Sequence, residues 1–167
     1  MEFFELIENR QSIRVFQARA VEEVKLQTIL QAANSAPSAG NFQAYEIFVV
    51  RRQEQRDILT RATFGQNFIA EAPVLLLFCM NPARCTYDGP ALFALQDTTI
   101  ACTFAMLAIQ AAGLATCWIG AFSPENIAKT MSLPQGLTPV AILPVGYSAE
   151  TPERTTRRSL NDLVHEI

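Results

Sequence analysis

The chain of 167 residues contains a single histidine, His165, close to its C-terminal end. Ser–His and Cys–His nucleophilic schemes both need an imidazole that a third group holds in place. We expect a histidine in that position to be a solvated tail residue. Most mechanisms of this kind are therefore excluded.

Two common phosphate-binding loops are also missing. No Gly-x-x-x-x-Gly-Lys-Ser/Thr segment occurs, which excludes a P-loop nucleotidase, and no Gly-x-Gly-x-x-Gly follows a strand, which argues against a standard dinucleotide domain. Glu22 and Glu23 stand at an expected helix start, where acidic residues favour the helix dipole, so they are not read as a catalytic pair. A chain this poor in acid–base groups is better suited to a cofactor that carries the chemistry.

Cysteine is present, but not at the spacing of a metal or redox site. The four cysteines stand at positions 79, 85, 102 and 117, with no Cys-x-x-Cys pair. This spacing and the single histidine exclude a zinc site. All four are expected to be buried free thiols, since disulfides would need an oxidising compartment and nothing suggests export.

Charge is scarce as well: 17% of the residues are charged, half are hydrophobic, and the net charge is -3. A nucleic-acid-binding protein usually carries a basic face, so nucleic acid is not expected as a partner. Met1 to Ile7 holds two glutamates and no basic cluster, so no export signal is read and a cytoplasmic location is expected. So few charges indicate that much of the surface is buried, most simply against a second subunit.

The longest charge-free stretch lies between Asp97 and Glu125 and is long enough to be tested as a membrane span. We reject that reading because neither flank is rich in Lys or Arg and four polar residues interrupt the run, namely Thr98, Thr99, Thr103 and Gln110. A helix that is apolar nearly all round is expected in a core or an interface.

The order of apolar and polar segments predicts one domain over residues 1–167. Helices are expected at 3–8, 22–35, 53–63 and 90–112, and from a Ser123 N-cap onward; strands are expected at 45–50, 73–80, 115–119 and 137–145. Residues 81–89 read as a polar loop, 150–158 as an extended arm and 159–165 as a turn of helix. This order suits a sandwich of helices on a central sheet.

Three segments could carry a function. Arg10 and Arg14, with Ser12 between them, follow the first helix; forked guanidiniums suit phosphate oxygens, but a solvated basic patch at a helix end is equally compatible. If the helix persists, the spacing of four puts both arginines on one face. Residues 37–43 are either an ordinary loop of turn-forming residues or a ligand loop. Gly120, at a strand end, is either a turn glycine or a backbone N–H that a flat ring can approach closely.

Taken in order, these segments resemble the nitroreductase family of FMN-dependent oxidoreductases, and the resemblance extends from Glu5 to Val164. The segment Arg10-Gln11-Ser12-Ile13-Arg14-Val15-Phe16 is similar to the family's opening Arg-Arg-Ser-Ile/Val-Arg-x-Phe/Tyr motif, with Gln11 in place of a basic residue. Residues 116–122 resemble the segment whose backbone amide approaches flavin N5. Residues 97–101 open a helix similar to the family's dimer-core helix.

The resemblance implies cofactor-binding residues from three parts of the chain. One group would hold the phosphate, ribityl chain and ring edge of FMN: Arg10, Gln11, Ser12, Arg14 and Arg157. A second matches the loop that reaches the flavin from the other subunit: Pro37, Ser38, Ala39, Asn41 and Gln43, with Ala39 replacing a common Ser. Ile119 and Gly120 would lie at the ring, with the Gly120 backbone near N5. No catalytic side chain is implied, because flavin N5 carries the chemistry.

The implied fold is an α+β sandwich with a central, mostly antiparallel sheet flanked by helices, in a domain-embracing homodimer. One FMN would lie at each interface site, and the arm at about 150–167 would reach the partner. The implied activity is hydride transfer from NADH or NADPH to a small-molecule acceptor such as a nitroaromatic or a quinone. The alternatives are a flavin-binding protein without turnover, and a dehalogenase or flavin-fragmenting enzyme on the same scaffold. The chain is short for the family; Tyr87 and Phe93 are either core aromatics or residues for substrate stacking.

Overall fold

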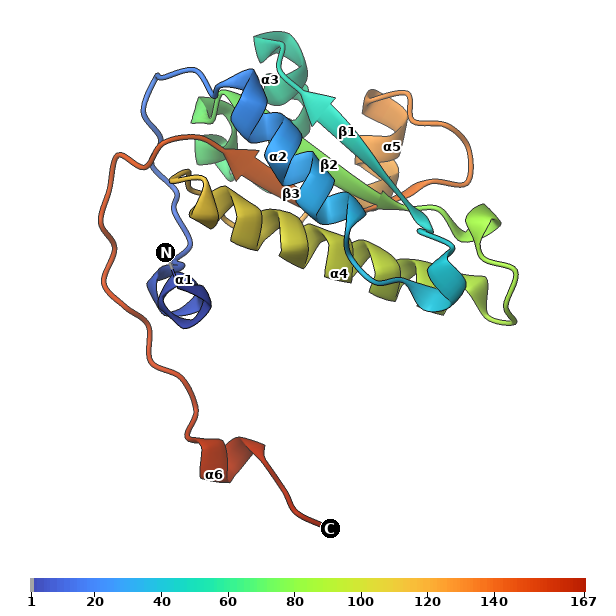
Figure 1. Cartoon of the computed structure of the whole chain (residues 1–167). Helices are drawn as coiled ribbons and strands as arrows, with labels where there is room; N and C mark the ends of the chain where they lie inside the picture. The colour runs from blue at the N-terminus through green and yellow to red at the C-terminus, as the bar shows by residue number, and fades with distance from the viewer. Residues whose placement is uncertain (1) are drawn as a thin grey trace.

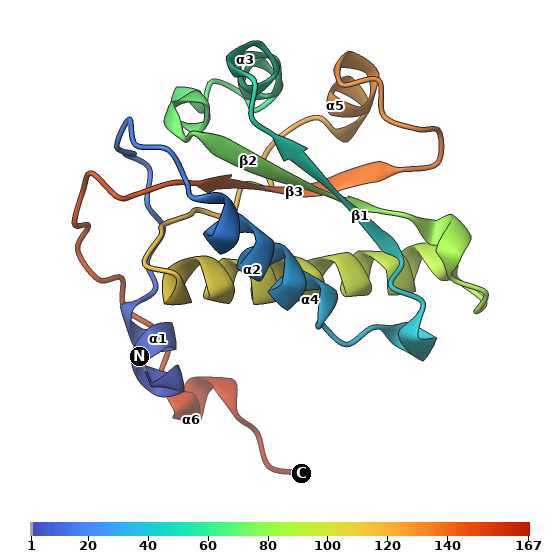
Figure 2. The same ribbon diagram turned by 45° about the horizontal axis from the view of Figure 1, so that its top comes forward.

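A three-stranded antiparallel sheet separates two helical layers in the computed structural model, which describes residues 2–167 (Figure 1). The strands β1 (Tyr45–Val50), β2 (Val74–Met80) and β3 (Thr138–Val145) lie in the order β1-β2-β3. The helices α2 (Glu23–Asn34) and α4 (Pro90–Ala111) cover one face, and α3 (Gln53–Arg61) and α5 (Pro124–Thr130) cover the other (Figure 2). The expected α+β sandwich with an antiparallel sheet is confirmed.

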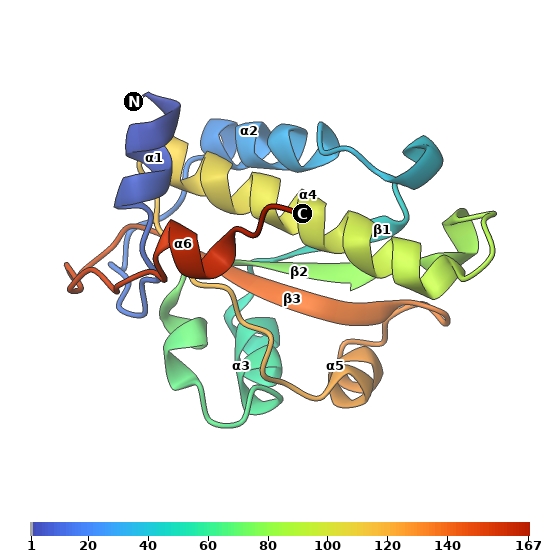
Figure 3. The same cartoon turned by 90° about the horizontal axis from the view of Figure 1, so that it is seen from below.

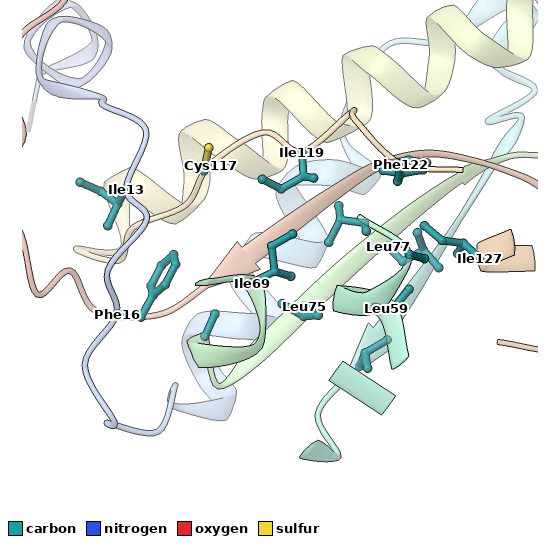
Figure 4. Packing of buried hydrophobic residues seen from close by; sticks show 14 of the residues in the cluster. Ile13, Phe16, Leu59, Ile69, Leu75, Leu77, Cys117, Ile119, Phe122 and Ile127 are labelled. Atoms are coloured by element: carbon teal, nitrogen blue, oxygen red, sulfur yellow. The ribbon is translucent and has the colours of Figure 1, made fainter. Parts of the chain in front are cut away.

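The central strand β2 is apolar on both sides because both of its faces are covered. Successive side chains of a strand point to opposite faces. Leu75, Leu77 and Cys79 belong to the core under α3 and α5 (Figure 4), whereas Leu76 and Phe78 belong to the core against α2 and α4. All four cysteines are buried and free, as expected, and burial raises the pKa of Cys79 to about 12.

The 22-residue helix α4 is the longest element and packs against α2, β2 and β3. Within residues 2–167 it is also the helix that is long and apolar enough to cross a membrane. It ends in a Schellman motif, in which Gly113 has φ +71°, Gly113 N–H donates to Gln110 and Leu114 N–H donates to Ile109. The helix α1 (Phe3–Asn9) lies beside this end, and the 3₁₀ turn η1 (Ala39–Asn41) lies near the start of α4 (Figure 1).

The expectation of a fourth strand at 115–119 is wrong. The structure has two separate bridges there, Ala115 to Gly146 and Ile119 to Ile142. In their shared register Cys117 faces Pro144, which has no N–H to donate, so the ladder is interrupted between them. The 3₁₀ turns η1, η2 (Asn67–Glu71) and η3 (Pro82–Arg84) were not expected. The helices and strands for which both ends were predicted otherwise match to within two residues at each end.

The C-terminal segment leaves the body of the domain. Residues 151–159 have no regular secondary structure, and α6 (Leu160–Leu163) follows on the α4 side of the sheet (Figure 3). The start of the segment is fixed, because Ala149 N–H donates to Val15 and Gln17 N–H donates to Tyr147. His165 is exposed, as expected of a tail residue.

Candidate functional site

Three arginines, two from the N-terminal segment and one from the C-terminal arm, line one cavity of about 340 Å³. We call it the arginine cavity; its lining residues are Arg10, Gln11, Ser12, Arg14, Pro152, Glu153, Thr155 and Arg157. The five residues that the sequence assigned to phosphate and ribityl binding are all among them. The structure therefore brings this part of the predicted site together.

The arginines at positions 10 and 14 do not share a helix face, contrary to the first expectation. Helix α1 ends at Asn9, and Arg10 is extended, with φ −65° and ψ 123°. Alternate residues of an extended chain face the same side, which places Arg10, Ser12 and Arg14 together. Ile13 points the other way and is buried in the core. Ser12 also forms a parallel bridge with Thr116, which joins this segment to the one that leads to Gly120.

The third arginine reaches the cavity because the arm starts beside the arginine motif. The carboxylate of Glu150 accepts hydrogen bonds from the N–H groups of Arg14 and Val15. Four residues later, Arg154 donates to the side chain of Asn9 over 2.6 Å. These contacts hold the N-terminal segment and the C-terminal arm side by side. Arg157, three residues farther along the arm, then lines the same cavity. Glu150 was not predicted from the sequence, because a carboxylate that binds backbone N–H groups has no sequence motif.

The arginine cavity has uncompensated positive charge. The ion pairs formed within residues 2–167 are Arg19–Glu22 and Arg51–Glu23, so the three cavity arginines have no carboxylate partner there. Glu153 is the one acidic residue of the lining, which leaves a formal charge of plus two. Guanidinium groups that are free of carboxylates and converge on one space suit a phosphate dianion.

The segment after Thr116 carries the ring-side candidates. Both backbone groups of Ile119 are paired with Ile142 at 3.0 Å, and its side chain is in the core, so it can offer only van der Waals contact. Gly120 is exposed, and its N–H has no acceptor within the described chain. Four extended residues span about 13 Å, so the segment leads from Ser12 to a free N–H well away from the arginines. The hydroxyl of Thr116 beside Ser12 is buried and has no hydrogen-bond partner within residues 2–167.

The 37–43 loop has an unusual backbone. Gly40, Asn41 and Gln43 have φ values of +53°, +56° and +50°. Position 40 requires glycine both for its positive φ and for lack of space. A Cβ there would lie 2.6 Å from the Phe42 ring and 2.8 Å from the Tyr87 hydroxyl. The side-chain amide of Gln43 donates to the backbone and side-chain oxygens of Asn41, both at 3.2 Å. The two amides that could meet a ring edge thus lie together.

A buried carboxylate holds this loop from the inside. Asp97 of α4, which is 1% exposed, accepts hydrogen bonds from Ala39 N–H at 2.8 Å and Ala44 N–H at 3.3 Å. Together with burial it raises the pKa of the neighbouring Tyr45 phenol. From the sequence, Asp97 was predicted only as part of a helix start. The signal that could have found it is the placement of a single carboxylate in an otherwise apolar helix.

Within one chain, the loop and the arginine cavity are separate. Asp97 holds the loop near the start of α4, whereas Gln110 near its end lies beside Gln11 and Arg154. Thirteen helical residues span about 20 Å, and Figures 1 and 2 show the two regions at opposite ends of the helix. Pro37, Ser38, Ala39, Asn41 and Gln43 therefore do not line the cavity of their own chain.

The aromatic candidates belong to the loop region. Tyr87 packs edge to face against Phe42, with ring centroids 5.0 Å apart, and against Phe93 at 5.6 Å. Tyr87 is 48% exposed, so it is not a core residue. Its place beside Gly40 keeps it a candidate for substrate contact. The described residues contain no cluster of His, Cys, Asp and Glu that could hold a metal.

Comparisons with known proteins find matches along nearly the whole chain. A family model described as "Nitroreductase family" matches residues 7–80 and 57–147. A solved nitroreductase family protein of Clostridium difficile 630 is 34% identical, with a TM-score of 0.89 over 99% of this chain and 98% of its own. The NADPH:FMN oxidoreductase of Vibrio harveyi, solved with NAD+, is 26% identical, with a TM-score of 0.92 over 98% of this chain and 76% of its own. The FMN reductase (NAD(P)H) of Bacillus subtilis is 27% identical over 99% of this chain and 73% of its own.

Proposed function

The chain belongs to the nitroreductase family, and we propose that it is an FMN-dependent oxidoreductase that uses NADH or NADPH. Its second substrate would be an electron-poor organic molecule such as a nitroaromatic or a quinone. Relatives named as an NADPH:FMN oxidoreductase and an FMN reductase support this activity. The observation that carries the proposal is the convergence of three arginines, free of carboxylate partners, on one cavity.

The residues present fit FMN at both of its ends. Arg10, Arg14 and Arg157 would bind the phosphate, and Ser12, which lines the same cavity, would meet the ribityl chain. The free N–H of Gly120 would donate to the ring. When bound, FMN supplies the hydride-transferring atom, flavin N5, that the side chains of this chain lack.

The separation of the loop from the arginine cavity favours a homodimer. If two copies pair with their α4 helices antiparallel, the loop of one copy comes to the arginine cavity of the other. Such an interface has apolar surface to bury, because Leu92, Leu95 and Phe104 of α4 are all more than a third exposed. The exposed apolar residues of α6, Leu160 and Leu163, would then cover the partner. In this arrangement residues 1–167 form one FMN-binding domain whose arm, 150–167, embraces the second copy.

The amides of Asn41 and Gln43 would then face the pyrimidine edge of the partner's flavin, which needs both donors and acceptors. Nicotinamide and acceptor would stack in turn on the open face of the ring, beside Tyr87. No acid–base side chain is required of the protein, so water can supply the protons.

The test begins with the colour of the purified protein. We expect a yellow protein, or one that turns yellow when FMN is added, whose absorbance near 450 nm is bleached anaerobically by NADH or NADPH (about one flavin per chain). Restoration of the absorbance by p-benzoquinone or a nitroaromatic completes the cycle. A colourless protein that takes up no FMN contradicts the proposal. Flavin that neither nicotinamide bleaches indicates the alternative, a flavin-binding protein without turnover.

The dimer is tested by sedimentation equilibrium. We expect a mass of twice the 18.5 kDa of the chain. Leu95→Asp, which places a charge on the exposed apolar face of α4, should shift the mass toward the monomer and weaken FMN binding with it. The variant Leu163→Ala, which changes an exposed leucine of the arm and not of α4, measures how much the arm contributes to dimer formation. A wild-type protein that stays monomeric while it binds FMN tightly would contradict the shared site.

A further inference from the structure

We propose that Arg84 is a positioning residue that holds the 37–43 loop in its cofactor-binding conformation; the inference rests on the proposed function. Arg84 belongs to the turn η3, in the loop that follows β2. It is not part of the family motif segments, and it does not line the arginine cavity. Its side-chain hydrogen bonds both go to the loop that would meet the partner's flavin.

The loop needs restraint from outside itself. Asn41 and Gln43 are not glycines, yet both have left-handed backbone angles, which cost roughly 1 kcal/mol or more for each residue. A free loop with this sequence would relax toward ordinary angles and move both side-chain amides. Asp97 fixes only its two ends, at Ala39 and Ala44. Residues 40–43, which carry the amides, lie between those two points.

Arg84 supplies the missing restraint. Its Nε–H is shared between two carbonyls of the loop, Phe42 O at 3.2 Å and Gln43 O at 3.0 Å. A shared N–H fixes the orientation of two successive peptide groups, and with them the side chain of Gln43. Arg84 is itself held in place, because its own N–H donates to Asn81 and Asn81 N–H donates to Ala44 at the start of β1. The two loops are thus joined at Ala44 and again at Arg84.

The aromatic contact completes the clamp. Tyr87, three residues after Arg84, packs on Phe42 and has its hydroxyl beside Gly40. The guanidinium of Arg84 makes no ion pair within residues 2–167, so it also adds an uncompensated positive charge next to the loop. The segment 81–89 therefore does more than connect β2 to α4, because its contacts to Phe42, Gln43 and Gly40 restrain the part of the ligand loop that Asp97 does not reach.

The experiment compares wild type, Arg84→Ala, Arg84→Lys and the control Arg52→Ala. Arg52 is an exposed arginine at the N-cap of α3, so its loss removes the same charge away from the loop. FMN dissociation constants are measured by quenching of flavin fluorescence, and the visible circular dichroism of the bound flavin reports its surroundings. Thermal unfolding of the FMN-free proteins controls for general stability.

We expect R84A to bind FMN about tenfold more weakly, the effect of about 1.4 kcal/mol, and to change the visible circular dichroism. R84K should be closer to wild type, because its ammonium can still reach one carbonyl. R52A should be unchanged. The inference is overturned if R84A binds within twofold of wild type, leaves the flavin spectrum unaltered, or loses no more affinity than R52A. A wild-type protein that binds no FMN overturns the proposed function, and this inference with it.

Discussion

The arginine cavity allows the contribution of the phosphate to FMN affinity to be distinguished from that of the ring and ribityl chain. Replacing Arg10 and Arg157 together with alanine removes two of the three cations while leaving Arg14 in place. A hydrogen bond to a charged group contributes about 1.5–3 kcal/mol, and we take the lower end for each because Arg10 is half-buried and Arg157 is exposed. Each single substitution should weaken FMN binding about tenfold, and the pair about a hundredfold.

The discriminating ligand is riboflavin, which has the same ring system and ribityl chain but no phosphate. Because the arginines act on the phosphate, the double variant should lose its preference for FMN while its affinity for riboflavin stays within about twofold of wild type. The preference of the wild type should also decrease with salt, since these charges are only partly buried. Calorimetric titration of the FMN-free proteins with both ligands measures this directly.

Two results would refute the reasoning. If riboflavin binding falls as much as FMN binding, the arginines support the fold of the site and do not act on the phosphate. If FMN binding is unchanged, the dianion lies elsewhere. The matched control for loss of charge is Arg61→Ala. Arg61 is an exposed arginine on α3 that does not line the cavity.

Three further predictions concern the scaffold. Asp97→Asn should lower the free energy of unfolding by about 2–3 kcal/mol, measured in urea, because a buried amide replaces a carboxylate that accepts two backbone N–H groups. Gly40→Ala should cost about 1–3 kcal/mol in the same assay, since φ is +53° and the new Cβ would lie 2.6 Å from Phe42; no loss would mean that the loop adapts freely. Tyr147→Phe should raise the pKa of Glu22 from about 2 toward its ordinary value of 4.5, because the phenol lies within hydrogen-bond distance of both carboxylate oxygens, at 2.9 and 2.8 Å. The lowered pKa stabilises the fold above about pH 4.5, and this contribution disappears as the pH falls toward 2, so the two proteins should converge there in acid unfolding.

Much of the scaffold could be predicted because its signals are local. The continuous apolar run of β2 could only be a covered strand, Gly113 marked the end of α4, and Ser123 caps α5 by accepting a hydrogen bond from Asn126 N–H. The missing fourth strand could also have been anticipated from Pro144, had the register across from residue 117 been considered.

The site was harder to predict, for a physical reason. The spacing of Arg10 and Arg14 would put them on one helix face only if the first helix continued. Because α1 ends at Asn9, an extended segment brings them together instead. Asp97 and Arg84 act on backbone N–H and carbonyl groups, which every residue possesses. Interactions of this kind leave no complementary partner in the sequence, so they emerge only once the chain is folded.

The length of α4 has a consequence for hybrids of the protein. In the proposed dimer each cofactor site takes its cations from one polypeptide and its amide loop from the other. A chain without Arg10 and Arg157, mixed with a chain without Asp97, would form heterodimers in which one site collects both lesions and its twin has neither. Each homodimer has one lesion in both of its sites, so unfolding and refolding the two proteins together should produce a fraction of sites with wild-type FMN affinity that neither preparation has alone.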